Sequence, residues 1–479
     1  MSPGKRISAV GPRIVFALAA ILLLIPPPFY MTVTPRAGNE PHRMSKTPKR
    51  VLVVSLDGLD ARYLERREEY GLRVPTLRRL MSEGAWSLRV KSVYPSVTYP
   101  THTTLVTGAL PARHGIYGNE LFEPPGTRQT GDWHWFARDI RAETLWDAAA
   151  REGLKTCLIS WPVGGGAGDY NVPEILKPSA PLLETLALMK ENARPRGLIE
   201  EVERHDPRLY GRSNREEQDD LRTRFAEYVI ETKRPEVVMV HLFDFDHAQH
   251  VFGPFSREAF AILEKEDEYV ARLVHACERA GTLSETAVFV VSDHGFRPIS
   301  KLFHPGVPLA RAGLMGAPNN AQGQKNDGWR AFAYVNSSSC AIIMRDRGDA
   351  ETLRKLRAIF KPLEGREGSG VARVLEREEV RALGANPDAA LVLEAADGFS
   401  FGFNLSGESV TPSVQRGQHG YLPTRPDYLT SFIASGAGIA RRGDLGPLRL
   451  QDIGPTIAHT LGLNLRDAQG RRIKVQSDE

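Results

Sequence analysis

Cysteine is scarce in this sequence. Its 479 residues include only three, Cys157, Cys277 and Cys340, which cannot all pair within one chain and are too few for a disulfide scaffold. No Cys-x-x-Cys pair supports a thiolate metal site, and no Cys-x-Pro-x-Arg motif offers the modified cysteine of a sulfatase. Any metal-binding or catalytic chemistry must therefore come from other side chains.

The sequence also lacks a marked excess of charge of either sign. Lys and Arg together number 62 and Asp and Glu 58, which gives a formal net charge of +4. This balance makes a weak case for nucleic acid, and we expect no specific nucleic-acid partner. With 41% hydrophobic and 25% charged residues, and no internal repeat, the composition is typical of a globular protein. The length is enough for about two or three domains.

One uncharged apolar run, residues 14–25, stands close to the N-terminus behind Lys5, Arg6 and Arg13. A basic segment followed by a short apolar one is typical of a secretory signal, and it falls short of the ~20 residues that span a bilayer. A buried core helix is the alternative. We expect residues 1–31 to be a signal peptide or an N-terminal membrane anchor, and 32–49 a linker. The protein would then be exported, and periplasmic, extracellular or membrane-anchored facing outside.

After the linker, apolar strand patterns alternate with helical ones. Val51–Leu56, Val237–Leu242 and Ala287–Ser292 are short Val-rich runs, as expected of buried parallel strands. The alternation predicts an α/β fold with a mostly parallel sheet flanked by helices. We expect one domain over residues 50–470, interrupted by a helical insertion at about 177–233 and by a second, β–α–β-like insertion at about 301–416. Substrate choice would depend on these insertions.

Acidic and imidazole side chains follow the ends of the predicted strands or precede the last one. The groups are Asp57; Asp246 and His250; Asp293 and His294; and His419. Because ligands collect beyond the carboxyl ends of parallel strands, we expect these side chains to converge. Carboxylate oxygen and imidazole nitrogen suit Zn²⁺ and related divalent ions.

Each group also has a simpler interpretation. Asp57 precedes a glycine and alone would indicate a turn. Asp293 and His294 could cap a helix, and Asp246 and His250 could lie on a solvated helix face. Asp244 and His247 compete with that last pair. The joint occurrence of four such groups favours a metal site over these separate explanations.

Residues 94–108 crowd hydroxyl groups at a turn that leads into a helix. A threonine there could be the helix N-cap, or a nucleophile that attacks phosphorus. On the residues alone, Thr98, Thr101, Thr103 and Thr104 all compete for that second role.

From Val51 to about Gly462 the sequence resembles the nucleotide pyrophosphatase/phosphodiesterases of the alkaline phosphatase superfamily. The resemblance is carried, in the family's order, by VSLDG, PSVTYPTHTTLVTG with PARHGIYGN, DFDHAQHVFGP, VVSDHGF and GQHGY. It implies an alkaline-phosphatase-like core with inserted cap regions. One departure follows Tyr99, because Thr101 stands where many relatives carry Asn.

The resemblance assigns a role to each motif residue. It makes Thr98 the nucleophile, Asn119 a donor to a phosphate oxygen, and Tyr99 the aromatic side chain that stacks on a nucleobase or another planar group. The two proposed sets of zinc ligands are Asp57, Thr98, Asp293 and His294 for one ion, and Asp246, His250 and His419 for the other. Mn²⁺ or Fe could replace zinc at such ligands.

The implied function is hydrolysis of phosphodiester or pyrophosphate bonds of nucleotides or related small molecules through a phospho-threonine intermediate. A phosphomonoesterase, a phosphonate hydrolase or a phospholipid-headgroup hydrolase on the same two-metal core is one alternative. A metal-containing binding protein of the cell envelope is another. The sequence leaves open the substrate, the metal, the attachment to a membrane and the oligomeric state.

Overall fold

A computed structural model describes residues 47–125, 130–175, 182–207, 218–315 and 328–476. The chain divides into Met1–His42 and Arg43–Glu479, and the fold described below belongs to the second unit. The signal or anchor expected at 1–31 and the linker up to residue 46 lie outside the described residues. No helix in the described ranges combines the length and apolar composition needed to cross a membrane.

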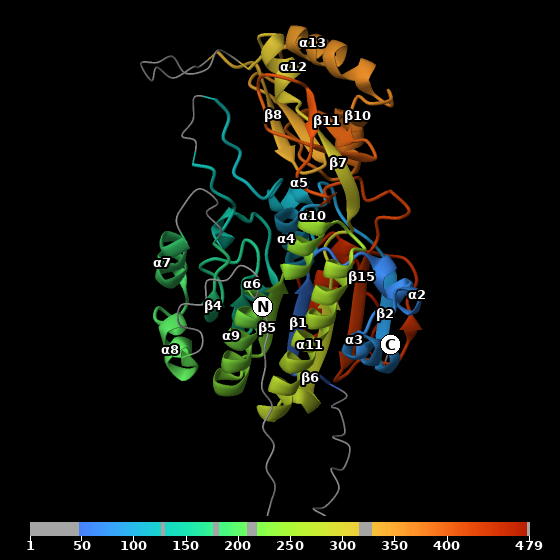
Figure 1. Ribbon diagram of the computed structural model, residues 1–479. Coiled ribbons are helices and arrows are strands. Elements are labelled where there is room, and N and C mark those ends of the chain that lie inside the picture. Colours follow the sequence, from blue (N-terminus) through green and yellow to red (C-terminus); the bar gives the residue numbers. More distant parts are fainter. Residues whose placement is uncertain (1–46, 126–129, 176–181, 208–217, 316–327, 477–479) are drawn as a thin grey trace, which may run out of the picture. The chain divides into compact units, whose positions relative to one another are not determined.

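A nine-stranded sheet forms the centre of the fold (Figure 1). Its strand order is β16-β2-β15-β6-β1-β5-β3-β4, and β17 also pairs with β2. The five strands from β6 to β4 run parallel to their neighbours, whereas β15 is antiparallel to β6 and β2. The bounds are β1 Arg50–Leu56, β2 Ala85–Lys91, β3 Thr156–Ile159, β4 Tyr170–Val172, β5 Val237–Leu242, β6 Thr286–Val291, β15 Thr430–Gly436, β16 Gly443–Asp444 and β17 Leu448–Arg449. The prediction of a mostly parallel α/β sheet is confirmed.

Helices cover both faces of this sheet, because the central strands are apolar on both sides. On β1, Leu52, Val54 and Leu56 face one core while Val51 and Val53 face the other. The first core contains α3 (Pro75–Glu83), α8 (Leu198–His205), α9 (Gln218–Lys233) and α11 (Arg257–Arg279). The second contains α4 (Thr98–Thr107), α6 (Leu145–Arg151) and α15 (Ile453–Thr460).

The two segments expected as insertions differ in their place in the fold. In the first, α9 packs on α11 and β5 and buries Phe225 and Val229 in the first core. This part of 177–233 is therefore a layer of the central fold and not a cap over it. Its described helices before α9 are α7 (Leu182–Asn192) and α8.

The second segment, residues 301–416, builds most of two further sheets, which β7 and β14 extend beyond its bounds, around a separate core. One is antiparallel, in the order β10-β11-β9-β8, and the other joins β7 to β12, β13 and β14. The bounds are β7 Arg297–Phe303, β8 Ala331–Asn336, β9 Ser339–Met344, β10 Val371–Glu376, β11 Ala389–Ala395, β12 Gly398–Phe401, β13 Val410–Pro412, β14 Gly417–Gln418, α12 Gly306–Arg311, α13 Ala350–Phe360 and α14 Arg377–Ala382. We call residues 301–416 the cap unit.

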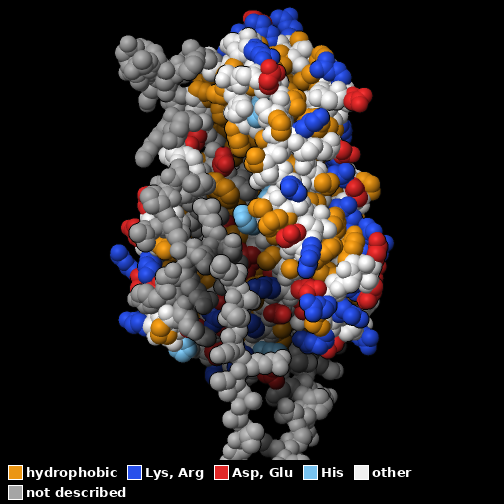
Figure 2. Space-filling model, viewed as in Figure 1, with side chains coloured by type: hydrophobic (Ala, Val, Ile, Leu, Met, Phe, Trp, Pro, Cys, Tyr) orange, Lys and Arg blue, Asp and Glu red, His pale blue; other side chains and the backbone are white. Residues whose placement is uncertain are grey.

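The remaining described α-helices are short. They are α1 Ala61–Glu65, α2 Arg67–Tyr70, α5 Pro111–His114 and α10 Asp244–Phe252. All three cysteines are buried and free, as their scarcity predicts for a fold held by its cores. Figure 2 shows basic and acidic side chains interspersed over one face of the molecule, which agrees with the small net charge.

Candidate active site

Three predicted ligands lie at the carboxyl ends of neighbouring parallel strands. Asp57 follows β1, Asp293 and His294 follow β6, and all three are buried. His294 Nε2 is 3.2 Å from both Asp57 Oδ1 and Asp293 Oδ2. Gly58, at φ +69°, donates its N–H to Asp293 Oδ1 at 3.1 Å, a turn that a side chain would strain. The strand ends thus bring two carboxylates and one imidazole to a single point.

A second group forms where α10 begins beyond β5. His250 Nε2 is 3.2 Å from Asp246 Oδ2, and His419 Nε2 is 3.7 Å from Asp246 Oδ1. The other ring nitrogens, Nδ1 of His250 and of His419, lie 3.0 Å and 3.3 Å from the backbone oxygens of Gly417 and Ser96. A ring that donates from Nδ1 to a carbonyl keeps a lone pair on Nε2, which is the arrangement common in metal-binding histidines.

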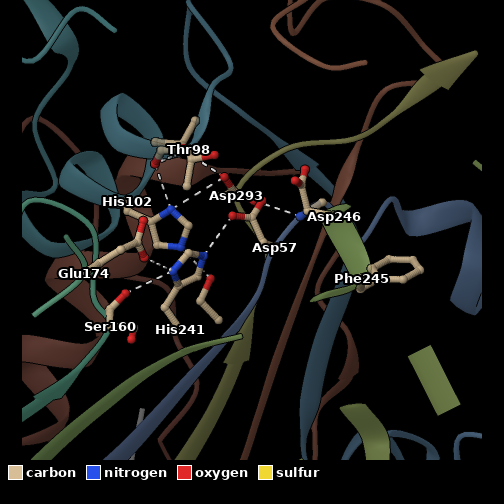
Figure 3. A network of polar contacts seen from close by, with 12 residues as sticks. Asp57, Thr98, His102, Ser160, Glu174, His241, Phe245, Asp246 and Asp293 are labelled. Atoms are coloured by element: carbon tan, nitrogen blue, oxygen red, sulfur yellow. Dashed lines mark hydrogen bonds and ion pairs between the residues drawn. The ribbon is translucent and has the colours of Figure 1, made fainter. Parts of the chain in front are cut away.

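The two groups adjoin each other. The rings of His294 and His419 stack with centroids 3.8 Å apart. Ligand atoms of Asp57, Asp293 and His294 lie within 4.8 Å of one another, as do those of Asp246, His294 and His419. Figure 3 shows Asp57, Asp293 and Asp246 turned toward one region next to Thr98. The six Asp and His side chains that the sequence predicted as ligands are therefore brought together.

The electrostatics of this cluster favour the binding of a cation. Burial, then the charges of Asp293 and Asp246, raise the pKa of Asp57 well above its ordinary value. Burial lowers the pKa of His294 to about 4 and that of His419 well below its ordinary value, so both imidazoles are neutral near pH 7 and keep lone pairs. Clustered carboxylates and neutral imidazoles in a buried site are the donor set of a divalent metal.

Unpaired buried atoms point to the same conclusion. Asp57 Oδ1, Asp246 Oδ1 and both ring nitrogens of His294 are buried without a hydrogen-bond partner among the described residues. Leaving a buried polar atom unpaired costs about 1–3 kcal/mol, more when it is charged. All four atoms belong to proposed ligands, and one or more divalent cations would satisfy the oxygens and one nitrogen of His294.

Thr98 is the first residue of α4 and is not its N-cap. The N-cap is Val97, with no side-chain capping bond, so the N-cap interpretation of Thr98 fails. The hydroxyls of Thr101, Thr103 and Thr104 are each engaged inside the protein, with Asp293 Oδ2, the backbone oxygen of Tyr99 and His114 Nε2 respectively. Those three residues are 0% exposed, whereas Thr98 is 9% exposed, which singles out Thr98 as the reactive candidate.

Asn119 and Tyr99 are coupled to each other beside Thr98. Asn119 Oδ1 accepts the backbone N–H of Tyr99 at 2.9 Å, so that N–H is not free for a phosphate oxygen. Tyr99 is 0% exposed, and its ring packs against Trp133 in a T-shaped arrangement with centroids 5.3 Å apart. Its ring therefore offers no accessible face for stacking, and the partly exposed Trp133 is the aromatic surface next to it.

Of the competing ligands, Asp244 and His247 lie apart from the cluster. Asp244 Oδ2 accepts the N–H of Asp219 and His247 is exposed. Sequence reasoning missed two residues of the site, His241 and Glu174. Burial opposes a charge on His241, but Glu174 and Asp57 outweigh it and raise its pKa to about 10. The available signal was a single histidine inside the otherwise apolar strand VVMVHL.

A parallel sheet with carboxylate and imidazole groups at its strand ends, beside a helix-terminal hydroxyl, is the architecture of alkaline-phosphatase-like, metal-dependent hydrolases. A sequence profile of the type I phosphodiesterase / nucleotide pyrophosphatase family matches residues 51–422. The chain belongs to this family, whose members are hydrolases of phosphodiester bonds.

Individual relatives are distant. The chain is 24% identical over 266 residues to human ectonucleotide pyrophosphatase/phosphodiesterase family member 1, across 54% of this chain and 24% of the relative. It thus spans about a quarter of the length of such relatives. It is 22% identical to the bovine bis(5'-adenosyl)-triphosphatase ENPP4, across 89% of this chain and 81% of the relative.

Solved structures show the same fold. Human ectonucleotide pyrophosphatase/phosphodiesterase 5 aligns with a TM-score of 0.61 at 18% identity, over 88% of this chain and 97% of that one. An inactive variant of the murine protein in complex with AMP aligns with a TM-score of 0.60, again at 18% identity and with the same shares of the two chains.

Proposed function

We propose that this protein is a two-metal hydrolase that cleaves phosphodiester or pyrophosphate bonds of small molecules, with Thr98 as the nucleophile. The observation that carries the proposal is the set of buried, unpaired ligand atoms on Asp57, Asp246 and His294 next to the helix-terminal Thr98. Family membership supports the reaction class, and the AMP bound to a structural neighbour supports a nucleotide as one part of the substrate.

The residues present fit two divalent cations. Asp57, Thr98, Asp293 and His294 would hold one ion, and Asp246, His250 and His419 the other. We propose zinc, because three of the seven ligands are imidazoles and the rest are oxygens. When bound, the two ions supply positive charge that stabilises both the Thr98 alkoxide and the negative charge of the phosphoryl group.

The side chains of the protein then account for the remaining steps. Thr98 stands at the N-terminus of α4, where the helix favours negative charge. Its Oγ1 forms a bond to phosphorus as the bond to the leaving-group oxygen breaks, and water hydrolyses the phospho-threonine to restore the hydroxyl. Because Asn119 Oδ1 is bound to the N–H of Tyr99, the amide nitrogen of Asn119 is the end that would donate to a phosphoryl oxygen.

Replacement of Thr98 tests the nucleophile. Thr98→Ala is expected to reduce hydrolysis of bis(p-nitrophenyl) phosphate by at least about a thousandfold, while elemental analysis still finds zinc held by the remaining ligands. Thr107→Ala is the matched control, because Thr107 is buried on the same helix and its hydroxyl bonds to the backbone of Thr103. Near-normal turnover by Thr98→Ala would contradict the proposal.

The ester class needs a separate measurement. We expect the wild-type protein to hydrolyse bis(p-nitrophenyl) phosphate faster than p-nitrophenyl phosphate. The opposite preference would assign the same centre to phosphomonoesters.

A further inference from the structure

One histidine, His241, is buried inside the central sheet beside the proposed metal centre. It lies on β5, opposite Ser55 of β1, and it is 1% exposed. Every other residue of β5 is apolar, and an imidazole in such a strand costs free energy unless its nitrogens are paired. Its partners therefore explain its presence.

The two ring nitrogens of His241 each meet a carboxylate. Nε2 is 2.8 Å from Asp57 Oδ2 and Nδ1 is 2.8 Å from Glu174 Oε2, with the backbone oxygen of Ser160 at 3.1 Å from Nδ1. Glu174 Oε1 accepts the hydroxyl of Tyr99 at 3.1 Å. Figure 3 shows His241 between Asp57 and Glu174, with the carbonyl of Ser160 beside it.

This chain of bonds leaves the two oxygens of Asp57 unequal. Oδ2 is occupied by His241, whereas Oδ1 is buried, has no hydrogen-bond partner in the part of the chain that the structure describes, and lies 3.2 Å from His294 Nε2. A carboxylate whose second oxygen is fixed by a neighbour presents the first to a metal in one orientation.

We propose that His241 and Glu174 are positioning residues that hold Asp57 as a one-oxygen ligand with Oδ1 toward the metal, and that the Tyr99 hydroxyl anchors Glu174. The inference rests on the proposed function only in taking Asp57 as a metal ligand. It also gives the buried Tyr99 a role that does not require an exposed ring.

A third cation is the competing explanation, since Asp57, His102 and His241 also offer ligand atoms within 4.8 Å of one another. The bonds argue against it. His102 Nδ1 lies 2.8 Å from the backbone oxygen of Thr98 and its Nε2 lies 2.8 Å from Ser55 Oγ. With both nitrogens of His241 facing carboxylates, neither imidazole has a lone pair directed at a shared point.

Two substitutions of His241 separate positioning from packing. An asparagine amide nitrogen falls near Nδ1 of a histidine, and a glutamine amide nitrogen falls near Nε2. His241→Asn keeps the bond to Glu174 and loses the bond to Asp57, while His241→Gln does the reverse. A packing role would make the two variants behave alike.

The experiment is a competition titration of zinc against a chromophoric chelator, with zinc counted by elemental analysis. We expect two ions per wild-type chain, and in His241→Asn a loss of about 10–100-fold in affinity for one of them with the other unchanged. His241→Gln should lose less, and Glu174→Gln and Tyr99→Phe less than His241→Asn. The control is His304→Asn, a buried histidine of the cap unit bonded to Thr411, which should keep both affinities.

The inference would be overturned if His241→Asn kept both zinc affinities, or if it lost both ions equally. Equal effects of the Asn and Gln variants, or a third ion in the wild type, would also overturn it. If His241→Asn does not fold, the zinc affinities of Glu174→Gln and His304→Asn are compared instead. Melting temperatures are measured for both variants, and a weaker affinity for one ion in Glu174→Gln alone would support the inference. A wild type that binds two zinc ions but hydrolyses no phosphoester would refute the proposed function and leave the positioning result intact. A wild type that binds no divalent cation would refute both.

Discussion

At the scale of single residues, Asn119 is fixed by the protein at one end of its amide. Oδ1 accepts the N–H of Tyr99 at 2.9 Å, and the backbone oxygen of Asn119 accepts the N–H of His134, also at 2.9 Å. Rotating the side-chain amide by half a turn would place its NH₂ group, a donor, against the N–H of Tyr99, which is also a donor. The donor end is therefore held in one direction before any substrate arrives, which is what electrostatic stabilisation of a transition state requires.

Substitutions of Asn119 separate its two roles. Asn119→Asp keeps the acceptor for the N–H of Tyr99 but removes the donor, so kcat/KM should fall by about 100–1000-fold with little change in melting temperature. Asn119→Ala removes both and should lower the melting temperature as well. Steady-state kinetics and thermal unfolding of the two variants provide the check, and wild-type kcat/KM in Asn119→Asp would exclude the phosphate role.

The residues that sequence could predict are those whose position follows from a strand end. Asp57, Asp293 and Asp246 were found because parallel strands place their carboxyl ends together. His241 and Glu174 were missed because their roles depend on partners 184 and 67 positions apart in the chain. Tyr99 was assigned a stacking role that its burial contradicts, since neither Trp133 nor Glu174 could be placed against it from the sequence.

At the scale of elements, the cap unit contacts segments that carry proposed site residues. Glu394 of β11 accepts the hydroxyl of Tyr94 at 3.1 Å, the N–H of Leu422 at 3.0 Å and the side chain of Arg425 at 3.0 Å. Tyr94 precedes Thr98 by four positions and Leu422 follows His419 by three. One buried carboxylate from the cap unit thus joins the segment of the proposed nucleophile, Thr98, to the segment of a proposed ligand, His419.

Removal of this carboxylate should weaken both the fold and the reaction. Glu394→Ala leaves the buried Tyr94 hydroxyl and the Leu422 N–H without their acceptor, at about 1–3 kcal/mol for each unpaired buried group, while Arg425 keeps its ion pair with Asp397. The value of kcat/KM should fall as the two segments lose their common anchor. Chemical denaturation and kinetics measure the two effects. Glu351→Ala, which removes an exposed ion pair with Lys355 on α13, should leave both unchanged. A Glu394→Ala protein as stable and as active as the wild type would show that the contact is dispensable.

The helices and strands were easier to predict than the elements against which they pack. The β–α–β-like pattern expected of the second insertion appears as β9 (Ser339–Met344), α13 (Ala350–Phe360) and β10 (Val371–Glu376), because apolar periodicity is a local signal. The position of α9 in the fold could not be predicted from the local sequence. Its sequence indicates a charged helix, and only the packing of Phe225 and Val229 on the sheet shows that it belongs to the central layer.

At the scale of the whole molecule, the active site destabilises the folded state unless cations are bound. The α/β core buries Asp57 and Asp293, and burial together with the charges of Asp293 and Asp246 raises the pKa of Asp57, so the ionised Asp57 opposes folding of the metal-free chain. Any ion that binds the folded chain and not the unfolded one stabilises it by about 2.7 kcal/mol at a concentration a hundredfold above its Kd. Metal binding, stability and pH are therefore linked.

The sign of the pH dependence follows from Asp57. Its pKa in the folded, metal-free chain is raised well above the ordinary 3.8 by burial and by Asp293 and Asp246, so the folded chain holds this proton more tightly than the unfolded chain. The stability that the protonated group contributes is present below its ordinary pKa and is lost as pH rises through the raised value. A bound cation needs the deprotonated ligand, so metal-loaded protein is favoured as pH rises.

The difference in melting temperature between zinc-loaded and chelator-treated protein should therefore widen as pH rises from the ordinary pKa of Asp57, 3.8, through its raised value. Scanning calorimetry at several pH values, with and without chelator, measures it. Asp57→Asn removes one buried charge, so its chelated form should melt above the chelated wild type at the higher pH, and its response to zinc should shrink. A difference that stays constant or narrows with pH would mean that the carboxylate cluster is not the place where the metal binds, because a cation and a proton that compete for the same oxygens cannot act independently.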